Sequence, residues 1–440
     1  MNRFVKYGIA AIIVCFLAGG AYFFMKPPTG AEIPSVFIHG YSGWGQYDER
    51  YEETPYWGLT LTDFRKMFAR WDQEIFMPSV GPHSSAWDRA CEIYAEMTGT
   101  RVDYGEAHSK KCGHERFGRD YSCKALIPDF TWDEDHPVNL VGHSFGGNTA
   151  RVLLDLLADG APEEVAATGE DTSPLFTGGH EDMVFSLSII ASPSNGATLV
   201  NATLENGEST GNSFSQSSNY DGYLDQFGIS SDDHRTRESV DAAIAETGFY
   251  DHNDSAVNDM QVDRACAMNA EIEMQPGVYY FCYYGCRTEE DGSGASVPTD
   301  NMCRFLKDQA AVIGSYSGKT AGSYSVGYGD EKETFKVPVQ NLDAEWQPND
   351  GTVNVVSAYC PYHLDADGNR VYDEHVEYSG TDAVQPGVWN ILPQFDEDHY
   401  GFIGGIYSED IMDVRPIYQD MHDRLEAYRT KIVGKNRYNR

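Results

Sequence analysis

The sequence predicts an α/β fold with a mainly parallel central sheet, and three observations lead to that prediction. Short apolar segments alternate with segments of helical spacing along the 440 residues. One apolar segment, residues 136–144, runs directly into a helical stretch that stops at Gly160. Hydrophobic residues make up 41% of the chain and aromatic residues 13%, which is enough for the sizeable core that such a sheet needs.

Each strand of this sheet is expected where a short apolar run is bounded by turn residues. The runs that fit are 33–40, 74–80, 136–144, 183–193 and 277–285, with 387–394 expected as the last strand. Between the fourth and fifth runs, residues 202–220 are polar and low in complexity, so a long loop is expected there.

The chain is strongly acidic, with 68 Asp and Glu residues against 32 Lys and Arg residues and a formal net charge of −36. This charge excludes nucleic acid as a partner, because a phosphate backbone would be repelled. It also favours high solubility. The excess of acidic residues does not by itself identify a substrate.

The N-terminus is predicted to direct export. Arg3 and Lys6 precede an uncharged, mostly apolar run over residues 7–25. Residues 1–30 are therefore expected to be a signal peptide or an N-terminal membrane anchor, with 7–25 as a possible membrane tether. Residues 31–440 would then be an exported domain, either secreted or anchored outside the cytoplasm.

Cysteine usage agrees with an oxidising compartment. Eight of the nine cysteines follow the apolar run, and an even number in an exported protein favours disulfides. The short-range candidates are Cys112 with Cys123, and a link among Cys282, Cys286 and Cys303.

The third strand ends in the sequence Gly142-His143-Ser144-Phe145-Gly146, a G-x-S-x-G motif between a strand and a helix. Glycines allow the tight turn that lifts a serine hydroxyl above the sheet edge. The first amide of the following helix, that of Phe145, can then donate to a developing oxyanion. We therefore predict Ser144 as a nucleophile.

Acyl transfer needs a second oxyanion donor, an acid and a base. The turn after the first strand, in residues 37–45, supplies the Tyr41 amide as the donor, with His39 beside it in an orienting role. Asp350, in an Asn-Asp-Gly turn, and His399, after the last strand, follow Ser144 in the expected order. With 68 acids and 13 histidines the chemistry alone leaves both open, and two competing acids are Asp396 and Asp398.

Several segments together carry a family resemblance. They include "HGYSGWG", "YWGL", a long stretch over residues 80–119 that contains "WDRACEIYAEMTG", "GHSFGGNTAR", "NDGTVN" and "GVWN". From about residue 33 to the C-terminus the chain resembles the zinc-containing bacterial lipases of the thermoalkaliphilic and staphylococcal type. The resemblance implies an α/β-hydrolase fold that cleaves triacylglycerols and other carboxylic esters. It also implies a Ser144, Asp350 and His399 triad, with oxyanion amides from Tyr41 and Phe145.

The same resemblance implies a structural zinc site. The family's ligands are the Asp of the "WDRA" motif, two histidines of the following loop and a later Asp, which correspond here to Asp88, His108, His114 and Asp251. Two carboxylates and two imidazoles make a closed tetrahedral set that would pin an insertion at about residues 85–125 to the domain. Cys112 lies between the histidines and could also suit zinc.

The chain departs from the family at the calcium site and at the lid. Gly401 stands two residues beyond His399, and no acid follows until Glu409, so the resemblance does not support calcium binding. Residues 364–374 have acid spacing faintly like a calcium loop, but a hairpin turn is favoured because Gly368 is misplaced for an EF-hand. The lid region, about residues 200–260, is short and polar, and no amphipathic helix of any size is expected after residue 201.

The expected function is therefore an exported lipase or esterase, acting through an acyl-enzyme on short to medium acyl esters or triacylglycerols. A phospholipase on the same scaffold is the first alternative, and a catalytically inactive binding protein is the second.

We predict that the protein lacks interfacial activation. A lid switch needs an apolar face whose burial is worth a few kcal/mol at roughly 25 cal/mol per Å². Across residues 202–220 the large apolar or aromatic side chains are only Leu204, Phe214 and Tyr220. The rate on a short-chain triglyceride should therefore rise smoothly through its solubility limit. A sharp increase at that limit would contradict the prediction.

Overall fold

The computed structural model describes residues 33–59, 63–122, 124–205, 252–380, 383–405 and 414–438. The segments expected as a signal or anchor (1–30) and most of the lid region (206–251) lie outside the described residues. Within the described ranges, none of the helices is long and apolar enough to cross a membrane.

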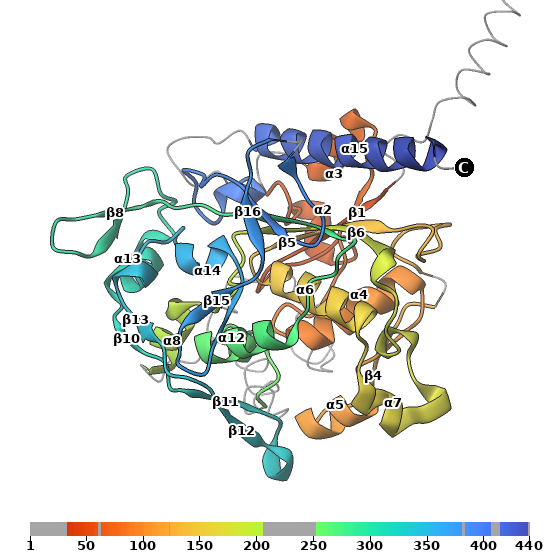
Figure 1. The fold of residues 1–440 in the computed structure, drawn as a ribbon, viewed down its shortest axis with the longest axis horizontal. Helices are drawn as coiled ribbons and strands as arrows, with labels where there is room; N and C mark the ends of the chain where they lie inside the picture. The colour runs from red at the N-terminus through yellow and green to blue at the C-terminus, as the bar shows by residue number, and fades with distance from the viewer. Residues whose placement is uncertain are drawn as a thin grey trace, which may run out of the picture.

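A seven-stranded sheet forms the centre of the molecule, in the order β16-β17-β7-β6-β5-β1-β2 (Figure 1). All of its strand pairs are parallel. In chain order the strands are β1 (Ser35–Ile38), β2 (Ile75–Phe76), β5 (Val138–His143), β6 (Val184–Ile190), β7 (Tyr279–Tyr283), β16 (His375–Glu377) and β17 (Trp389–Ile391). This confirms the predicted mainly parallel α/β architecture.

Helices cover both faces of the sheet because successive side chains along each strand point to opposite sides. On β1, Val36 and Ile38 join an apolar cluster with α4 (Ala86–Thr98) and α6 (Phe145–Ala158). Phe37, between them, joins a second cluster with α3 (Phe64–Phe68) and α15 (Arg415–Tyr438). Figure 1 shows α3 and α15 above the strands and α4 and α6 below them. Except for the edge strand β16, the strands are buried on both faces, which explains their nearly continuous apolar sequence.

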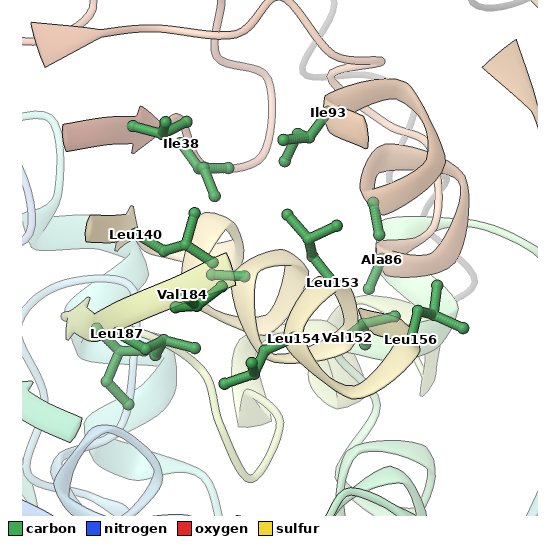
Figure 2. Packing of buried hydrophobic residues seen from close by; sticks show 14 of the residues in the cluster. Ile38, Ala86, Ile93, Leu140, Val152, Leu153, Leu154, Leu156, Val184 and Leu187 are labelled. Atoms are coloured by element: carbon green, nitrogen blue, oxygen red, sulfur yellow. The ribbon is translucent and has the colours of Figure 1, made fainter. Parts of the chain in front are cut away.

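The helix α6 is the most deeply packed of these elements. Leu153, which has no exposed surface, turns toward Ile93 of α4, and Leu140 and Leu187 of the sheet belong to the same apolar cluster (Figure 2). The position of α6 fixes the turn that precedes it, and that turn contains Ser144.

The remaining elements surround this core. Among the described residues, the other α-helices are α2 (Glu49–Glu53), α5 (Glu106–Cys112), α7 (Pro162–Thr168), α8 (Thr198–Glu205), α11 (Ala256–Asp259), α12 (Val262–Glu271), α13 (Lys307–Ser315) and α14 (Val355–Tyr359). In the same part of the chain, two-stranded ribbons pair β3 (Arg101–Asp103) with β4 (Phe117–Asp120), β8 (Thr288–Glu290) with β9 (Ser296–Pro298), β10 (Gly318–Lys319) with β13 (Asn341–Leu342), β11 (Ser323–Val326) with β12 (Glu333–Lys336), and β14 (Tyr362–Leu364) with β15 (Arg370–Tyr372).

The hairpin expected near residues 364–374 is confirmed by β14 and β15. The Asp365 carboxylate accepts the backbone amides of Asp367 and Asn369 at 2.9 and 2.8 Å, so it closes the turn rather than presenting its oxygens to calcium.

One strand of the central sheet was not predicted, and the prediction of one loop is wrong. The edge strand β16 was not predicted, because the short sequence His375–Glu377 has no apolar signal of its own. The start of the expected loop at residue 202 is instead the second turn of α8, in which Val200 and Ala202 are buried against the body. A short apolar helix therefore does form there, contrary to the sequence prediction.

The predicted disulfides are also not found among the described cysteines, all of which are free thiols. Cys282 is on the central strand β7 and donates to the carbonyl oxygen of Ala358, whereas Cys303 is buried in a separate cluster, so the link among Cys282, Cys286 and Cys303 is wrong. Cys112 is a free thiol in the structure, and Cys123 lies outside the described residues.

We predict that Leu153→Ala lowers the free energy of unfolding by about 2–5 kcal/mol, because it leaves a cavity between α6 and α4. Chemical denaturation followed by tryptophan fluorescence measures the change. Val165→Ala, at a position 41% exposed on α7, is the matched control and should change stability by less than about 0.5 kcal/mol. Equal effects of the two substitutions would contradict the packing described for α6.

Candidate active site and metal site

Ser144 sits at the junction of β5 and α6 with an unusual backbone conformation, φ 55° and ψ −133°. A positive φ at a residue other than glycine is strained and persists only where the surroundings impose it. Here the Ser144 amide donates to the carbonyl oxygen of Ile190 on β6 at 2.9 Å. The strain turns the chain sharply from the strand into the helix.

The two glycines of the motif permit this turn through close backbone approach. A Cβ added to Gly142 would lie 2.4 Å from the carbonyl carbon of Gly146. A Cβ added to Gly146 would lie 2.2 Å from the carbonyl oxygen of Ile38 on β1. Neither position has room for any side chain, so the motif is required by the packing of α6 against the sheet.

His399 and Asp350 form a buried pair next to this turn. His399 Nδ1 lies 2.9 Å from Asp350 Oδ2, and the two residues are 4% and 1% exposed. The second carboxylate oxygen accepts the amides of Thr352 and Val353 at 2.9 and 2.7 Å. An Nδ1–H donated to the carboxylate leaves Nε2 as the basic nitrogen of His399.

The residue before Ser144 contacts this histidine. The ring of His143, the residue directly before Ser144, has its centroid 4.6 Å from that of His399. Ser144 itself is 6% exposed. The three residues predicted as a triad thus occupy one region at the carboxyl end of β5.

The two competing acids make other contacts. The carboxylate of Asp398 accepts the amides of Cys303, Tyr400 and Gly401 at 2.7, 3.1 and 2.9 Å, which ties down the loop that carries His399. Asp396 forms an ion pair with Arg287 at 3.1 Å.

The turn after β1 approaches Ser144 closely. A Cβ added to Gly40 would lie 3.1 Å from Ser144 Oγ, so the segment that includes Tyr41 lies beside the hydroxyl. On the other side, Phe145 is the first residue of α6, where the helix dipole favours negative charge. His39 is buried and its Nδ1 donates to the Gly40 carbonyl oxygen. Burial and the nearby Arg89 lower the pKa of His39 to about 3, so its imidazole is neutral.

A second cluster of ligand-type side chains comes from α4, from α5, from the turn after α5 and from the segment before α11. His108 Nε2 is 3.1 Å from Asp254 Oδ2 and 3.2 Å from Asp88 Oδ1. His114 Nε2 is 3.2 and 3.9 Å from the same two oxygens. Asp88 Oδ1 and His114 Nε2 are buried and make no hydrogen bond of good geometry. Converging, unsatisfied donor atoms of this kind fit a bound cation.

The orientation of the imidazoles supports the same interpretation. His114 Nδ1 donates to the Glu115 carbonyl oxygen at 2.9 Å, so its Nε2 lone pair points into the cluster. Burial alone would lower the pKa of His114, but Asp88 and Asp254 raise it to about 9. The carboxylates therefore create a strong negative potential at the point where a cation would sit.

Cys112 also belongs to this neighbourhood, and together with His108, His114 and Asp254 it forms a possible metal-binding group. Its Sγ lies 4.0 Å from His108 Nδ1, whereas the carboxylates approach Nε2 on the other side of the ring. Asp88 is therefore a better ligand than Cys112 for a single cation that binds Nε2 of both histidines.

The fourth predicted metal ligand, Asp251, is not the carboxylate seen next to the histidines. Asp251 lies outside the described residues, and the carboxylate that meets both histidines belongs to Asp254. The two acids stand three residues apart in "YDHNDSA", and the sequence offers no local signal that separates them. Asp254 is therefore a candidate for the fourth position, and Asp251 stays a prediction.

The surrounding contacts hold α5 in place. The Glu164 carboxylate on α7 accepts the amides of Ala107 and His108 at 3.0 and 2.7 Å, which satisfies the exposed start of the short helix. The ring of Trp87 stacks on His108 with centroids 4.9 Å apart. The helix α4, which carries Asp88, packs against α6, so the cluster is attached directly to the core.

Comparison with known proteins places this arrangement in a family. A family model described as "Lipase-like, C-terminal domain" matches residues 31–322. The lipase of Staphylococcus hyicus is 32% identical over 383 residues. The chain belongs to the bacterial lipase family.

The fold agrees with solved members of the family. The crystal structure of Staphylococcus hyicus lipase has a TM-score of 0.71 and 28% identity, covering 91% of this chain and 97% of that one. EstA from Clostridium botulinum has a TM-score of 0.73 and 30% identity, covering 92% and 90%. The match to the full Staphylococcus hyicus lipase covers 84% of this chain and 53% of the lipase, so the chain spans about half the length of that relative. The α/β-hydrolase prediction is confirmed.

We predict that the purified protein binds about one divalent metal ion per chain and that Asp254→Asn removes most of it, because this substitution deletes a converging carboxylate. Elemental analysis by mass spectrometry measures the metal. Chelation should lower the melting temperature by several degrees, since a ligand bound only to the folded state stabilises it. Asp251→Asn is the matched control. Loss of metal from the Asp251 variant alone would reverse the assignment.

Proposed function

We propose that the protein is an exported carboxylic-ester hydrolase that works through an acyl-enzyme on Ser144. The single observation that carries this proposal is the strained serine at the strand-to-helix turn, lying beside a buried His399–Asp350 pair. This arrangement combines a nucleophile, a base and an acid that orients the base. Similarity to proteins named lipases supports the same reaction class.

In the first half-reaction His399 Nε2 takes the proton of Ser144 Oγ while the oxygen attacks the ester carbonyl carbon. The amides of Tyr41 and Phe145 donate hydrogen bonds to the carbonyl oxygen as it becomes negative. Asp350 holds the protonated imidazole in position and stabilises its charge. The C–O bond to the alcohol then breaks, and the imidazolium gives its proton to the departing oxygen.

In the second half-reaction a water molecule attacks the acyl-enzyme, and His399 takes one of its protons. The tetrahedral intermediate forms on the same two amides. It collapses when Ser144 Oγ leaves and regains the proton from His399. The products are a carboxylic acid and the free enzyme, so the site needs no further reactant.

We propose zinc as the cation of the second cluster, held by Asp88, His108, His114 and Asp254. Two imidazoles and two carboxylates suit zinc in a closed tetrahedral site. Bound there, zinc would supply positive charge that joins α4, α5 and the segment before α11, with no vacant position for substrate. Its role is structural. The resemblance gives no support for calcium, and the described residues add none.

The proposed substrates are short to medium acyl esters or triacylglycerols. A phospholipase activity on the same scaffold is the alternative, because the reacting bond and the catalytic groups would be identical. Export is proposed from residues 1–30, which would place the enzyme outside the cytoplasm as a secreted or tethered protein.

We predict that Ser144→Ala lowers the turnover of p-nitrophenyl butyrate by at least about 10⁴-fold, because no other group can form the acyl-enzyme. His399→Ala should be comparably severe, since the triad acts as a unit. Asp396→Asn, at an exposed competing acid, is the control and should keep most of the activity. A series of esters with increasing acyl length, with a phospholipid alongside, identifies the preferred substrate.

If the Ser144 variant retained a tenth of wild-type turnover, the proposed mechanism would be wrong. Absence of any ester hydrolysis by metal-loaded wild-type protein would reject the proposed function altogether.

A further inference from the structure

A buried hydrogen-bond chain connects the turn after β1 with the loop that carries His399. Its first half is centred on Tyr56, whose hydroxyl oxygen lies 3.0 Å from the Gly40 amide nitrogen and 2.6 Å from His143 Nδ1. In the second half, His143 Nε2 lies 3.0 Å from the carbonyl oxygen of His399. Tyr56, His143 and His399 are 7%, 1% and 4% exposed, so water has little access to these bonds.

The chemistry of the donors and acceptors allows one direction for this chain. The Gly40 amide can only donate, so the Tyr56 oxygen accepts from it. The tyrosine proton then goes to His143 Nδ1, which must be unprotonated. A neutral imidazole with a bare Nδ1 carries its proton on Nε2, and that proton is donated to the His399 carbonyl oxygen.

Burial keeps both intermediate groups in the required protonation states. Loss of solvation holds the pKa of His143 well below its usual range, and the nearby His399 lowers it further. Burial also raises the pKa of Tyr56 far above its usual value. A neutral histidine and a neutral phenol therefore persist across the working pH range, and the chain keeps its direction.

The ends of the chain are the two segments whose relative position decides catalysis. Gly40 immediately precedes Tyr41, the proposed oxyanion donor, and a Cβ on Gly40 would lie 2.6 Å from Ser144 Cβ. The other end is the backbone of the proposed base. The chain runs beside Ser144, because His143 directly precedes it. The two terminal bonds of the chain thus restrain the oxyanion turn and the His399 backbone. The positions of these groups relative to the reacting atoms must be accurate to a fraction of an ångström.

We propose that Tyr56 and His143 are positioning residues for ester hydrolysis, which together hold the oxyanion turn at residues 39–41 in register with His399. This inference rests on the proposed function. Neither side chain reacts with substrate. Their contribution is to fix the Gly40–Tyr41 backbone and the His399 backbone relative to Ser144 before the substrate arrives.

Tyr56→Phe is the first test, since it removes one oxygen and preserves the ring that packs against Trp44 and Trp57. The measured quantity is kcat per active site, with sites counted by titration with an organophosphorus ester that labels the reactive serine. We expect kcat to fall roughly 10- to 100-fold, less than for loss of a direct oxyanion donor, and KM to change by less than about twofold.

Tyr362→Phe is the matched control. It deletes the same atom from a fully buried tyrosine, whose hydroxyl donates to the Gln340 side chain in a separate apolar cluster. It should lower the melting temperature about as much as Tyr56→Phe while leaving kcat per titrated site unchanged. A purely structural role for Tyr56 would make the two variants indistinguishable in kcat.

Two substitutions at His143 separate the halves of the chain. Asn places its amide near Nδ1, so His143→Asn keeps an acceptor for Tyr56 but loses the donor to His399. Gln reaches the position of Nε2, so His143→Gln keeps that donor but loses the acceptor for Tyr56. Each single variant should lose roughly tenfold in kcat per site.

The double variants give the decisive comparison. Tyr56→Phe should cost less than about threefold in the His143→Gln background, where its bond to His143 is already absent. In the His143→Asn background it should cost its full 10- to 100-fold. Unchanged kcat per site in Tyr56→Phe, or equal costs in the two backgrounds, would overturn the chain. Wild-type protein that hydrolyses no ester would instead reject the underlying function, so the two failures are distinguishable.

Discussion

The strained backbone of Ser144 is the constraint on which the rest of the structure depends. A residue with a side chain adopts φ 55° only where several surrounding elements leave no alternative. Those elements are β5 and β6, which hold the Ser144 amide, and α6, whose first turn presses against the carbonyl oxygen of Ile38. The close packing of α6 on the sheet requires glycine at 142 and 146. The same packing leaves Ser144 as the residue that must carry the strain.

The helix α4 links the two candidate sites through adjacent residues. Asp88 faces the histidine cluster, while Arg89 donates to the carbonyl oxygen of His39 beside the oxyanion turn. The Arg89 guanidinium also lies 5.1 Å from the centre of the Phe145 ring. Burial lowers the pKa of Arg89 to about 10, which still leaves it charged at neutral pH. One rigid helix therefore supports the metal cluster on one side and the serine site on the other.

Much of the fold could be predicted because its central strands are buried on both faces. Such strands read as continuous apolar runs, and all six expected runs coincide with strands, namely β1, β2, β5, β6, β7 and β17. The edge strand β16 could not be predicted in this way. Two of its three residues are polar and exposed, and the single Val376 is no apolar run, so only pairing with β17 makes this segment a strand. The helix α8 depends similarly on tertiary packing of Val200 and Ala202.

The residues of the candidate sites differ in how far the sequence alone could identify them. Ser144 follows from a local motif in its required context, whereas Asp350 and His399 needed the family resemblance, because the chain has many acids and histidines. Asp251 and Asp254 differ by three positions on one short loop, and only the three-dimensional path selects Asp254. An even number of cysteines favours disulfides, but the number alone does not tell which sulfur atoms lie close enough to bond. The described thiols are all free: Cys91, Cys282 and Cys360 share one apolar cluster without forming a bond, and Cys266 and Cys303 lie in two others.

The most direct test of the central claim is to trap the reacting oxygen. Purified protein is treated with diethyl p-nitrophenyl phosphate, and the modified residue is located by peptide mass spectrometry. We expect one phosphoryl group per chain, on Ser144, appearing as ester hydrolysis disappears, and no labelling of Ser144→Ala. Complete loss of hydrolysis with Ser144 unmodified, or labelling at another residue with the same kinetics, would contradict the central claim.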